Sequence, residues 1–212
     1  MTTRFYLKHA AATVPMSPAF SGSWEVTGSM YRATCVNGTP SGDTLSTIAV
    51  ADSSSTDKDV GCAQFISYRP LATGQTITGS QALKAQCRGS ETGTGNNMFL
   101  AIGIRIIASD GTTVRKTVLD VTRDATEFTT SLVNRQFTAT SAATNYTTLD
   151  GDFIVIEIGA GGDPTGSNPH DYSLRLGDSS GSDLPEDDSS TSDFNPWVQF
   201  NDTLTFVAPT NF

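Results

Sequence analysis

Apolar residues along this chain occur in short runs or at alternate positions, and no segment of useful length shows helical spacing. The strongest run covers residues 153–158, Phe-Ile-Val-Ile-Glu-Ile, in which only Glu157 is polar. The run is entered through an Asp-Gly turn and is followed by Gly159, Gly161 and Gly162. A run this short, bounded by turn residues, predicts a buried strand that ends near Gly159. We expect the other strands to pack around it.

The clearest hairpin lies between residues 98 and 122. Residues 98–108 form a long, mostly apolar run, and residues 113–122 return with Val114, Val118 and Val121. Between them, Asp110-Gly111 provides the positive φ angles that a tight hairpin turn requires. We therefore predict two antiparallel strands joined at this turn.

The remaining period-two segments bring the total to about ten strands, which is typical of an all-β protein. We predict a two-sheet antiparallel β-sandwich of jelly-roll type, formed as one domain by residues 21–212. Residues 1–20 are predicted to be an extended N-terminal arm, because Pro15 and Pro18 oppose a helix after the first short strand. The other expected strands are residues 4–7, 24–36, 44–50, 62–68, 74–88, 128–137, 172–176 and 197–207.

Composition excludes several classes of function. The formal net charge of −9 and the pI near 4.5 argue against nucleic-acid binding, which needs a cationic surface. The apolar run near the N-terminus is three residues long and is flanked by charges, so it cannot be the core of a signal peptide. No apolar stretch approaches the roughly 20 residues of a membrane span. We expect no membrane partner and synthesis in the cytosol, that of the host if the protein is viral.

The three cysteines, Cys35, Cys62 and Cys87, show no CxxC spacing, and the chain has only two histidines. A zinc site is therefore not expected. The pattern favours buried, reduced thiols, and one disulfide between two of the three is the alternative.

Residues 177–181, Gly-Asp-Ser-Ser-Gly, match the Gly-x-Ser-x-Gly pattern of a nucleophile elbow. The elbow requires a strand leading into a helix and a histidine further along the chain, whereas no histidine follows His170. The reverse order of a serine protease would need an upstream histidine, and His9 has no supporting motif. A Gly/Ser turn explains the residues better, so we expect no catalytic residues and no enzymatic activity.

The segment 178–193 is acidic and contains no Lys or Arg. Calcium takes six to eight oxygen ligands, which a loop of carboxylates and hydroxyls can supply. The spacing fits no EF-hand, and a solvated acidic loop is the simpler interpretation. No cofactor is expected, and calcium is the alternative. The calcium candidates are Asp178, Asp183, Glu186, Asp187 and Asp188.

Carbohydrate-binding sandwiches expose aromatic rings that stack on sugar rings. Trp24 and Trp197 are the main candidates for such a platform, and the further aromatic candidates are Tyr31, Tyr68, Tyr146 and Tyr172. Trp197 alternates with apolar neighbours as a core residue does, so burial in the core is the competing interpretation for both tryptophans.

Three stretches carry a resemblance to a known family. They are the opening Met-Thr-Thr-Arg-Phe-Tyr-Leu, the run 150–159, and the ending that includes Asn-Pro-Trp-Val-Gln-Phe. Together they make the chain similar to a family of structural proteins of tailed-bacteriophage virions. The resemblance implies a virion component and supplies no catalytic residue.

The sequence therefore predicts a non-enzymatic protein of the virion surface, most simply a capsid decoration protein bound to the head lattice. Its expected partners are the major capsid protein or tail proteins, in many copies or as a homo-oligomer. A tail or fibre-associated component and a carbohydrate-binding adhesin with the same fold are the alternatives. If the chain is bound to a lattice, we expect the arm, residues 1–20, to be ordered against a neighbouring chain.

Overall fold

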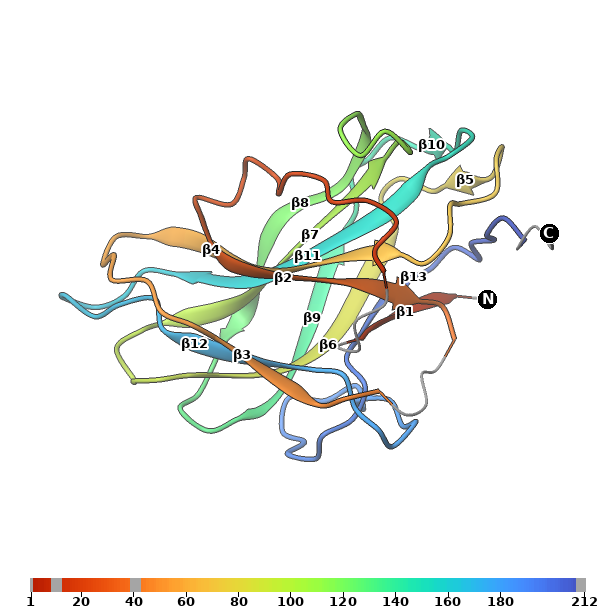
Figure 1. The fold of residues 1–212 in the computed structure, drawn as a ribbon. Helices are drawn as coiled ribbons and strands as arrows, with labels where there is room; N and C mark the ends of the chain where they lie inside the picture. The colour runs from red at the N-terminus through yellow and green to blue at the C-terminus, as the bar shows by residue number, and fades with distance from the viewer. Residues whose placement is uncertain (1, 9–12, 39–42, 209–212) are drawn as a thin grey trace.

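The computed structural model describes residues 2–8, 13–38 and 43–208, and within these ranges every regular element is a strand. The chain folds back on itself so that strands from distant parts of the sequence lie side by side (Figure 1). The strands are β1 (Thr3–Leu7), β2 (Val26–Val36), β3 (Ser46–Val50), β4 (Lys58–Ser67), β5 (Thr76–Ile77), β6 (Ala82–Glu91), β7 (Met98–Ile107), β8 (Val114–Glu127), β9 (Val133–Thr140), β10 (Tyr146–Thr147), β11 (Phe153–Gly162), β12 (Tyr172–Leu176) and β13 (Trp197–Phe200).

The all-β prediction is confirmed, and the predicted number of ten strands was too low for the part of the chain that the structure describes. Eleven strands form one continuous sheet in the order β3-β12-β6-β13-β1-β2-β4-β11-β7-β8, with β9 on the free side of β6. Strands β5 and β10 form a separate pair. The prediction of a purely antiparallel arrangement was wrong, because β2 and β4 run parallel.

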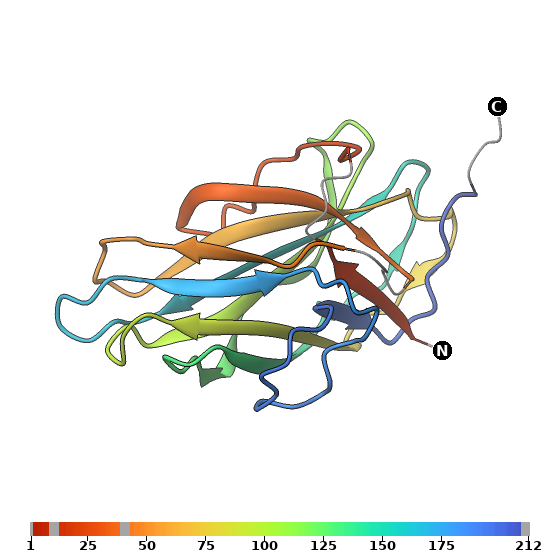
Figure 2. The same ribbon diagram turned by 60° about the horizontal axis from the view of Figure 1, so that its bottom comes forward.

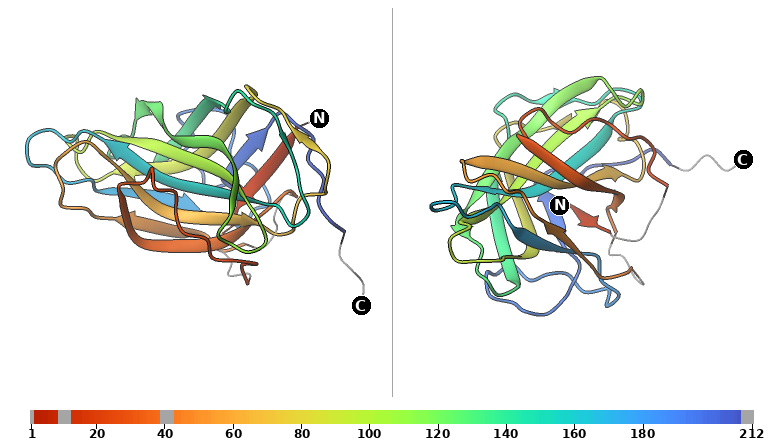
Figure 3. Two further views of the ribbon diagram at one scale, coloured as in Figure 1. Left: turned by 90° about the horizontal axis from the view of Figure 1, so that it is seen from above. Right: turned by 60° about the vertical axis from the view of Figure 1, so that its left-hand side comes forward.

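The large sheet curls so that two of its parts face each other across the main core (Figure 3). That core contains side chains of β6 and β12, such as Leu83 and Leu174, together with those of β7 and β11, such as Ile104 and Ile156. Alternation in β11 directs Ile154, Ile156 and Ile158 into this core. Phe153, Val155 and Glu157 therefore point to the opposite, outer face of the sheet.

The predicted hairpin is confirmed. Strand β7 passes to β8 through Asp110-Gly111, and Gly111 has a φ of 71°. The carboxylate of Asp110 accepts hydrogen bonds from the backbone N–H groups of Thr112 and Thr113, both at 2.8 Å. These bonds fix the turn at the position that the sequence indicates.

Strand β11 does not end at Gly159 as predicted but continues to Gly162. These glycines are not turn residues, because each lies where a neighbouring group approaches the strand closely. A Cβ atom at Gly159 would overlap the Val60 carbonyl oxygen and the Trp24 ring, and one at Gly162 would overlap the Asn97 carbonyl oxygen. The glycines thus allow close packing on the strand.

Glu157 is fully buried on the outer face of the sheet. Its carboxylate accepts hydrogen bonds from the backbone N–H of Ser21 (3.1 Å), the indole Nε1 of Trp24 (3.0 Å) and Nε2 of Gln64 (3.0 Å). The guanidinium of Arg105 forms an ion pair with the same group. A buried charge is tolerated only with such partners.

These contacts hold residues 13–24, here called the crossing segment, on the outer face of the protein's own sheet. Arg105 also donates to the Ala19 carbonyl oxygen at 2.7 Å, and Arg32 donates to that of Pro18 at 3.2 Å. Nearer the N-terminus of the segment, Val14 and Met16 pack on an outer apolar cluster of Ile66, Ile107, Phe153 and Val155.

The region expected to be an N-terminal arm, residues 1–20, thus includes β1, which pairs with β13 and β2 inside the sheet. It also includes most of the crossing segment, which contacts the same chain. Met1 and residues 9–12 lie outside the described residues.

Replacing Glu157 by Gln puts an NH₂ group where donors converge, so at least one buried donor loses its acceptor. We expect Glu157→Gln to lower the free energy of unfolding by about 3–5 kcal/mol. The matched control is Glu186→Gln, whose side chain is 39% exposed and whose ion pairs should contribute at most about 1 kcal/mol. Urea denaturation of the three proteins measures both effects, and equal midpoints for the two variants would contradict this account.

Candidate functional site

The parallel pairing of β2 and β4 places the carboxyl ends of both strands at one edge of the sheet. The backbone N–H of Tyr68 donates to the Cys35 carbonyl oxygen at 3.0 Å and fixes this register. Asn37 directly follows β2, and Tyr68 and Arg69 directly follow β4, so the three side chains emerge close together.

The C-terminal part of the chain provides the opposite wall. The backbone N–H of Val207 donates to the Pro70 carbonyl oxygen at 3.0 Å, and that of Ala72 donates to the Thr205 carbonyl oxygen at 2.9 Å. Between these bonds, Leu71 and Phe206 form an isolated β-bridge. Residues 204–207 are therefore held against the connection that leaves β4.

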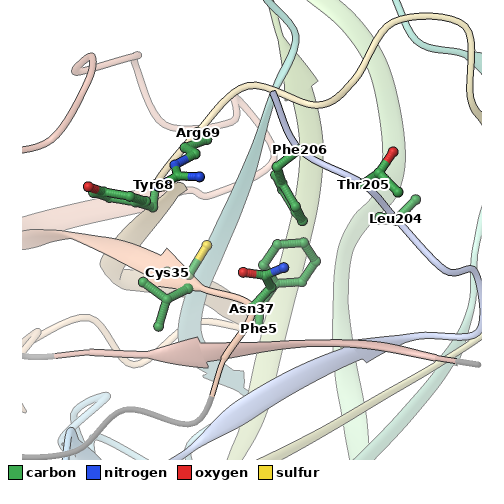
Figure 4. A pocket seen from close by; sticks show the side chains of 9 residues that line it. Phe5, Cys35, Asn37, Tyr68, Arg69, Leu204, Thr205 and Phe206 are labelled. Atoms are coloured by element: carbon green, nitrogen blue, oxygen red, sulfur yellow. The ribbon is translucent and has the colours of Figure 1, made fainter. Parts of the chain in front are cut away.

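The two walls enclose a pocket of about 520 Å³, here called the end pocket (Figure 4). Its inner wall is apolar, with Phe5 and Cys35 fully buried and Leu204 nearly so. Polar groups of Asn37, Arg69 and Thr205 lie at its rim. The lining residues are Phe5, Cys35, Val36, Asn37, Tyr68, Arg69, Leu204, Thr205 and Phe206.

Two side chains at the rim are unusual for this protein. Tyr68 is 58% exposed, the largest value among the large hydrophobic side chains that the structure describes. The guanidinium carbon of Arg69 lies 5.2 Å from the centroid of the Tyr68 ring, and the group has no hydrogen bond or ion pair with the described residues. Five other arginines form ion pairs within the chain, namely Arg4, Arg88, Arg105, Arg115 and Arg123. Arg175 resembles Arg69 in having none with the described residues, but it does not line the pocket.

The acidic residues proposed for calcium are engaged by cationic side chains and backbone groups of the chain, and Asp183 and Glu186 share Arg4. Asp183 pairs with Arg4 at 2.6 Å and accepts a hydrogen bond from Tyr6, and Glu186 pairs with Lys84 at 2.7 Å. Among the described residues, no group of three or more His, Cys, Asp or Glu side chains is placed to hold a metal ion.

The other three carboxylates accept hydrogen bonds from backbone N–H groups, local ones for Asp178 and Asp187 and a distant one for Asp188. Asp178 binds Ser180, and Asp188 accepts a hydrogen bond from the backbone N–H of Gln136 at 2.7 Å. The backbone N–H groups of Ser190 and Ser189 donate to the carboxylate of Asp187. These bonds lower the pKa of the Asp187 carboxyl group, and the bond from Ser190 has the larger effect. The acidic segment is thus a bonded surface loop in this structure.

Neither tryptophan offers a ring to solvent. Trp24 is 5% exposed and lies over Gly61 and Gly159, with its indole N–H bound to Glu157. Trp197 is fully buried, its Nε1 donates to the Leu184 carbonyl oxygen at 2.9 Å, and Arg4 covers its ring at 3.7 Å. Both tryptophans are therefore core residues in this structure and do not form a sugar-binding platform.

The Gly-x-Ser-x-Gly stretch forms a bend that no helix follows. His170 is fully buried, with Nδ1 2.8 Å from the Ser54 carbonyl oxygen and Nε2 3.1 Å from that of Gly162. The ring therefore lies between the loop that follows β3 and the end of β11, with each nitrogen facing a carbonyl oxygen. His9, the other histidine considered for catalysis, lies outside the described residues.

The three cysteines are unpaired and buried, so the disulfide alternative does not describe this structure. Burial raises the pKa of the Cys62 and Cys87 thiols to about 12, and it raises the pKa of Cys35 as well. Cys35 lines the end pocket, yet its side chain is not accessible from it.

Sequence reasoning missed the end pocket. Its residues lie at four separate places in the chain and share no motif, and the parallel register that unites Asn37 with Tyr68 was not predicted. The signal that was present is the dipeptide Tyr68-Arg69 before Pro70, where an aromatic ring and a cation follow a buried strand directly.

Comparison with known proteins gives no assignment. No family model matches the chain, and no curated protein matches its sequence. A CocE/NonD family hydrolase from Staphylococcus aureus is similar in structure with a TM-score of 0.44 and 9% identity, over 95% of this chain and 36% of the hydrolase. The VP2 subviral particle protein of infectious bursal disease virus gives a TM-score of 0.28 and 15% identity, over 75% of this chain and 33% of that protein.

This chain thus spans about a third of the length of these structures, and TM-scores below 0.5 carry no inference about its function. None of the segments that the structure describes forms an apolar helix of membrane-spanning length.

Burial and raised pKa values leave the cysteines with little thiolate near neutral pH, and thiolate is the reactive form. We expect a thiol reagent such as 5,5′-dithiobis(2-nitrobenzoate) to label none of the three in the folded protein within minutes at pH 8. In denaturant all three should react at once. Fast labelling of any thiol in the folded state would contradict this expectation, and assignment of the label to Cys35 by peptide mass spectrometry would show that the end pocket opens.

Proposed function

We propose that this chain is a non-enzymatic structural protein of a tailed-bacteriophage virion, made in the host cytoplasm and bound in many copies to the outside of the head lattice. The resemblance of its opening, middle and closing stretches to phage structural proteins supports this proposal. We further propose that the curled sheet is a sandwich of jelly-roll type.

The observation that carries the proposal is a difference between the outer strands of the sheet, which are β3, β8 and β9. The outer side of β9 is engaged by the acidic loop, since the backbone N–H groups of Asn134 and Gln136 donate to Ser190 and Asp188. Strand β8 pairs with β7 through four register shifts, and such bulges protect an edge from pairing with another chain. Strand β3 pairs with β12 in a regular register and has no charged residue in Ser-Thr-Ile-Ala-Val (Figure 2). An edge of this kind favours addition of a strand from a partner protein.

Charge supports the same conclusion. A chain with a net charge of −9 repels its own copies in solution, while the uncharged edge at β3 leaves one contact region without like charges. The acidic loop contributes to rigidity, since Asp183 and Glu186 bind Arg4 and Lys84 of the sheet. A rigid body with one unprotected edge is suited to binding at fixed positions on a lattice.

A tail or fibre-associated component is the alternative within the virion. A carbohydrate-binding adhesin is the second candidate, and the end pocket with its exposed Tyr68 is the observation that favours it.

The proposal predicts that β3 is needed for attachment. In particles assembled from the genome that encodes this chain, we expect the double variant Thr47→Lys/Ala49→Lys to fold but to be lost from the particle surface, because both positions are exposed on β3. The matched control is Val114→Lys on β8, which is 46% exposed and should attach normally. Quantitative mass spectrometry of purified particles gives the copy numbers.

Electron microscopy of the same particles with the protein labelled distinguishes the locations. Label over the whole head surface, in tens to hundreds of copies, is expected. Label confined to the tail supports the alternative component, and complete absence from particles overturns the virion proposal.

A further inference from the structure

We propose that the end pocket binds a carboxylate-bearing sugar, such as a uronic acid residue of a polysaccharide. This inference goes beyond the structural role proposed above and does not depend on where the protein sits in a particle. It rests on the cation, the exposed ring and the polar rim that converge at the carboxyl ends of β2 and β4.

The charge of the ligand follows from Arg69. A guanidinium binds a carboxylate through two parallel N–H donors, and that of Arg69 is not engaged by any hydrogen bond or ion pair with the described residues. No Asp or Glu is among the residues that line the pocket, so no carboxylate of the pocket itself competes for this cation. In a chain with a net charge of −9, this is a local site at which an anion is favoured.

The shape of the ligand follows from Tyr68 and the pocket. A ring that is 58% exposed beside a cavity offers a flat apolar surface on which the C–H face of a sugar can lie. The volume of about 520 Å³ is within the range of small-molecule sites and suits one or two sugar rings. The buried Phe5 and the half-buried Phe206 continue this apolar surface inward.

The hydroxyl groups of a sugar need partners that both donate and accept. Asn37 has an amide that does both, and the hydroxyl of Thr205, which donates to Oε1 of Gln75 at 3.4 Å, can still accept. Both residues are exposed, and they come from different walls of the pocket, Asn37 from the end of β2 and Thr205 from the C-terminal part of the chain (Figure 4). A ligand that is apolar throughout leaves the Asn37 amide and the Arg69 guanidinium without partners, so an acidic sugar fits better than a hydrocarbon.

The experiment titrates the purified full chain with oligogalacturonate and oligoglucuronate of two or three units, followed by isothermal calorimetry and NMR. Neutral galactose and glucose oligomers of the same length are the matched ligands. We expect the acidic sugars to bind at least about tenfold more tightly than the neutral ones, and this preference should weaken with added salt.

Variants assign the binding to the pocket. Tyr68→Ala should weaken acidic sugar binding at least about tenfold, and Tyr68→Phe should retain it, because the phenyl ring preserves the stacking surface. Arg69→Gln should remove the preference for the acidic sugar, and Arg69→Lys should keep part of it. Leu149→Ala, at a residue that is 44% exposed and does not line the pocket, is the surface control.

The melting temperature of each variant is measured first. Only variants whose melting temperature equals that of the parent protein are then compared for sugar binding. Three outcomes overturn the proposal: no acidic sugar binds, the neutral sugars bind equally well, or Tyr68→Ala binds as the parent does. Tighter binding of a peptide with a free C-terminal carboxylate, with the same dependence on Arg69, also overturns it and assigns the pocket to a protein partner. None of these results bears on attachment through β3, so the two proposals are tested separately.

Discussion

A carboxylate buried in the most apolar strand of the protein determines how the outer face of the sheet is built. Glu157 cannot remain charged there without donors, and the donors come from β4, β7 and the crossing segment. The N-terminal part of the chain is thereby fixed on its own sheet through polar bonds at specific atoms. Removing the segment would take two hydrogen-bond donors, those of Ser21 and Trp24, away from the carboxylate of Glu157. It would also uncover the apolar cluster around Phe153. The segment is therefore part of the folded body.

The parallel pair of β2 and β4 links this core to the end pocket. Gln64 of β4 contacts both Glu157 and Arg32 of β2, so the polar row on the outer face crosses the same pair whose carboxyl ends carry Asn37 and Tyr68. A shift in the register of β2 against β4 would break the contact between Arg32 and Gln64 and would separate the rim residues of the pocket. The internal network and the candidate binding site thus depend on one strand alignment.

The elements that could be predicted from the sequence are those with local signals. The Asp110-Gly111 turn and the alternation in residues 153–158 specify a hairpin and a buried strand by themselves. The parallel register, the continuation of β11 through its glycines and the burial of Trp24 depend on residues far apart in the chain, and no local pattern encodes them. For the same reason the tryptophans were poor candidates for a binding platform, while Tyr68, one of the further aromatic candidates, had no local signal that set it apart as the exposed ring.

Hydrogen exchange of the unmodified protein tests directly whether Glu157 makes the crossing segment part of the folded body. The two protons to follow by NMR are the backbone N–H of Ser21 and the indole N–H of Trp24, with the backbone N–H of Val155 in β11 as the reference. If the account is right, Ser21 and Trp24 exchange only through global unfolding, with the same free energy as Val155. Exchange of either proton about a thousandfold faster than that of Val155, equivalent to about 4 kcal/mol, would show that the segment opens independently and would contradict the account.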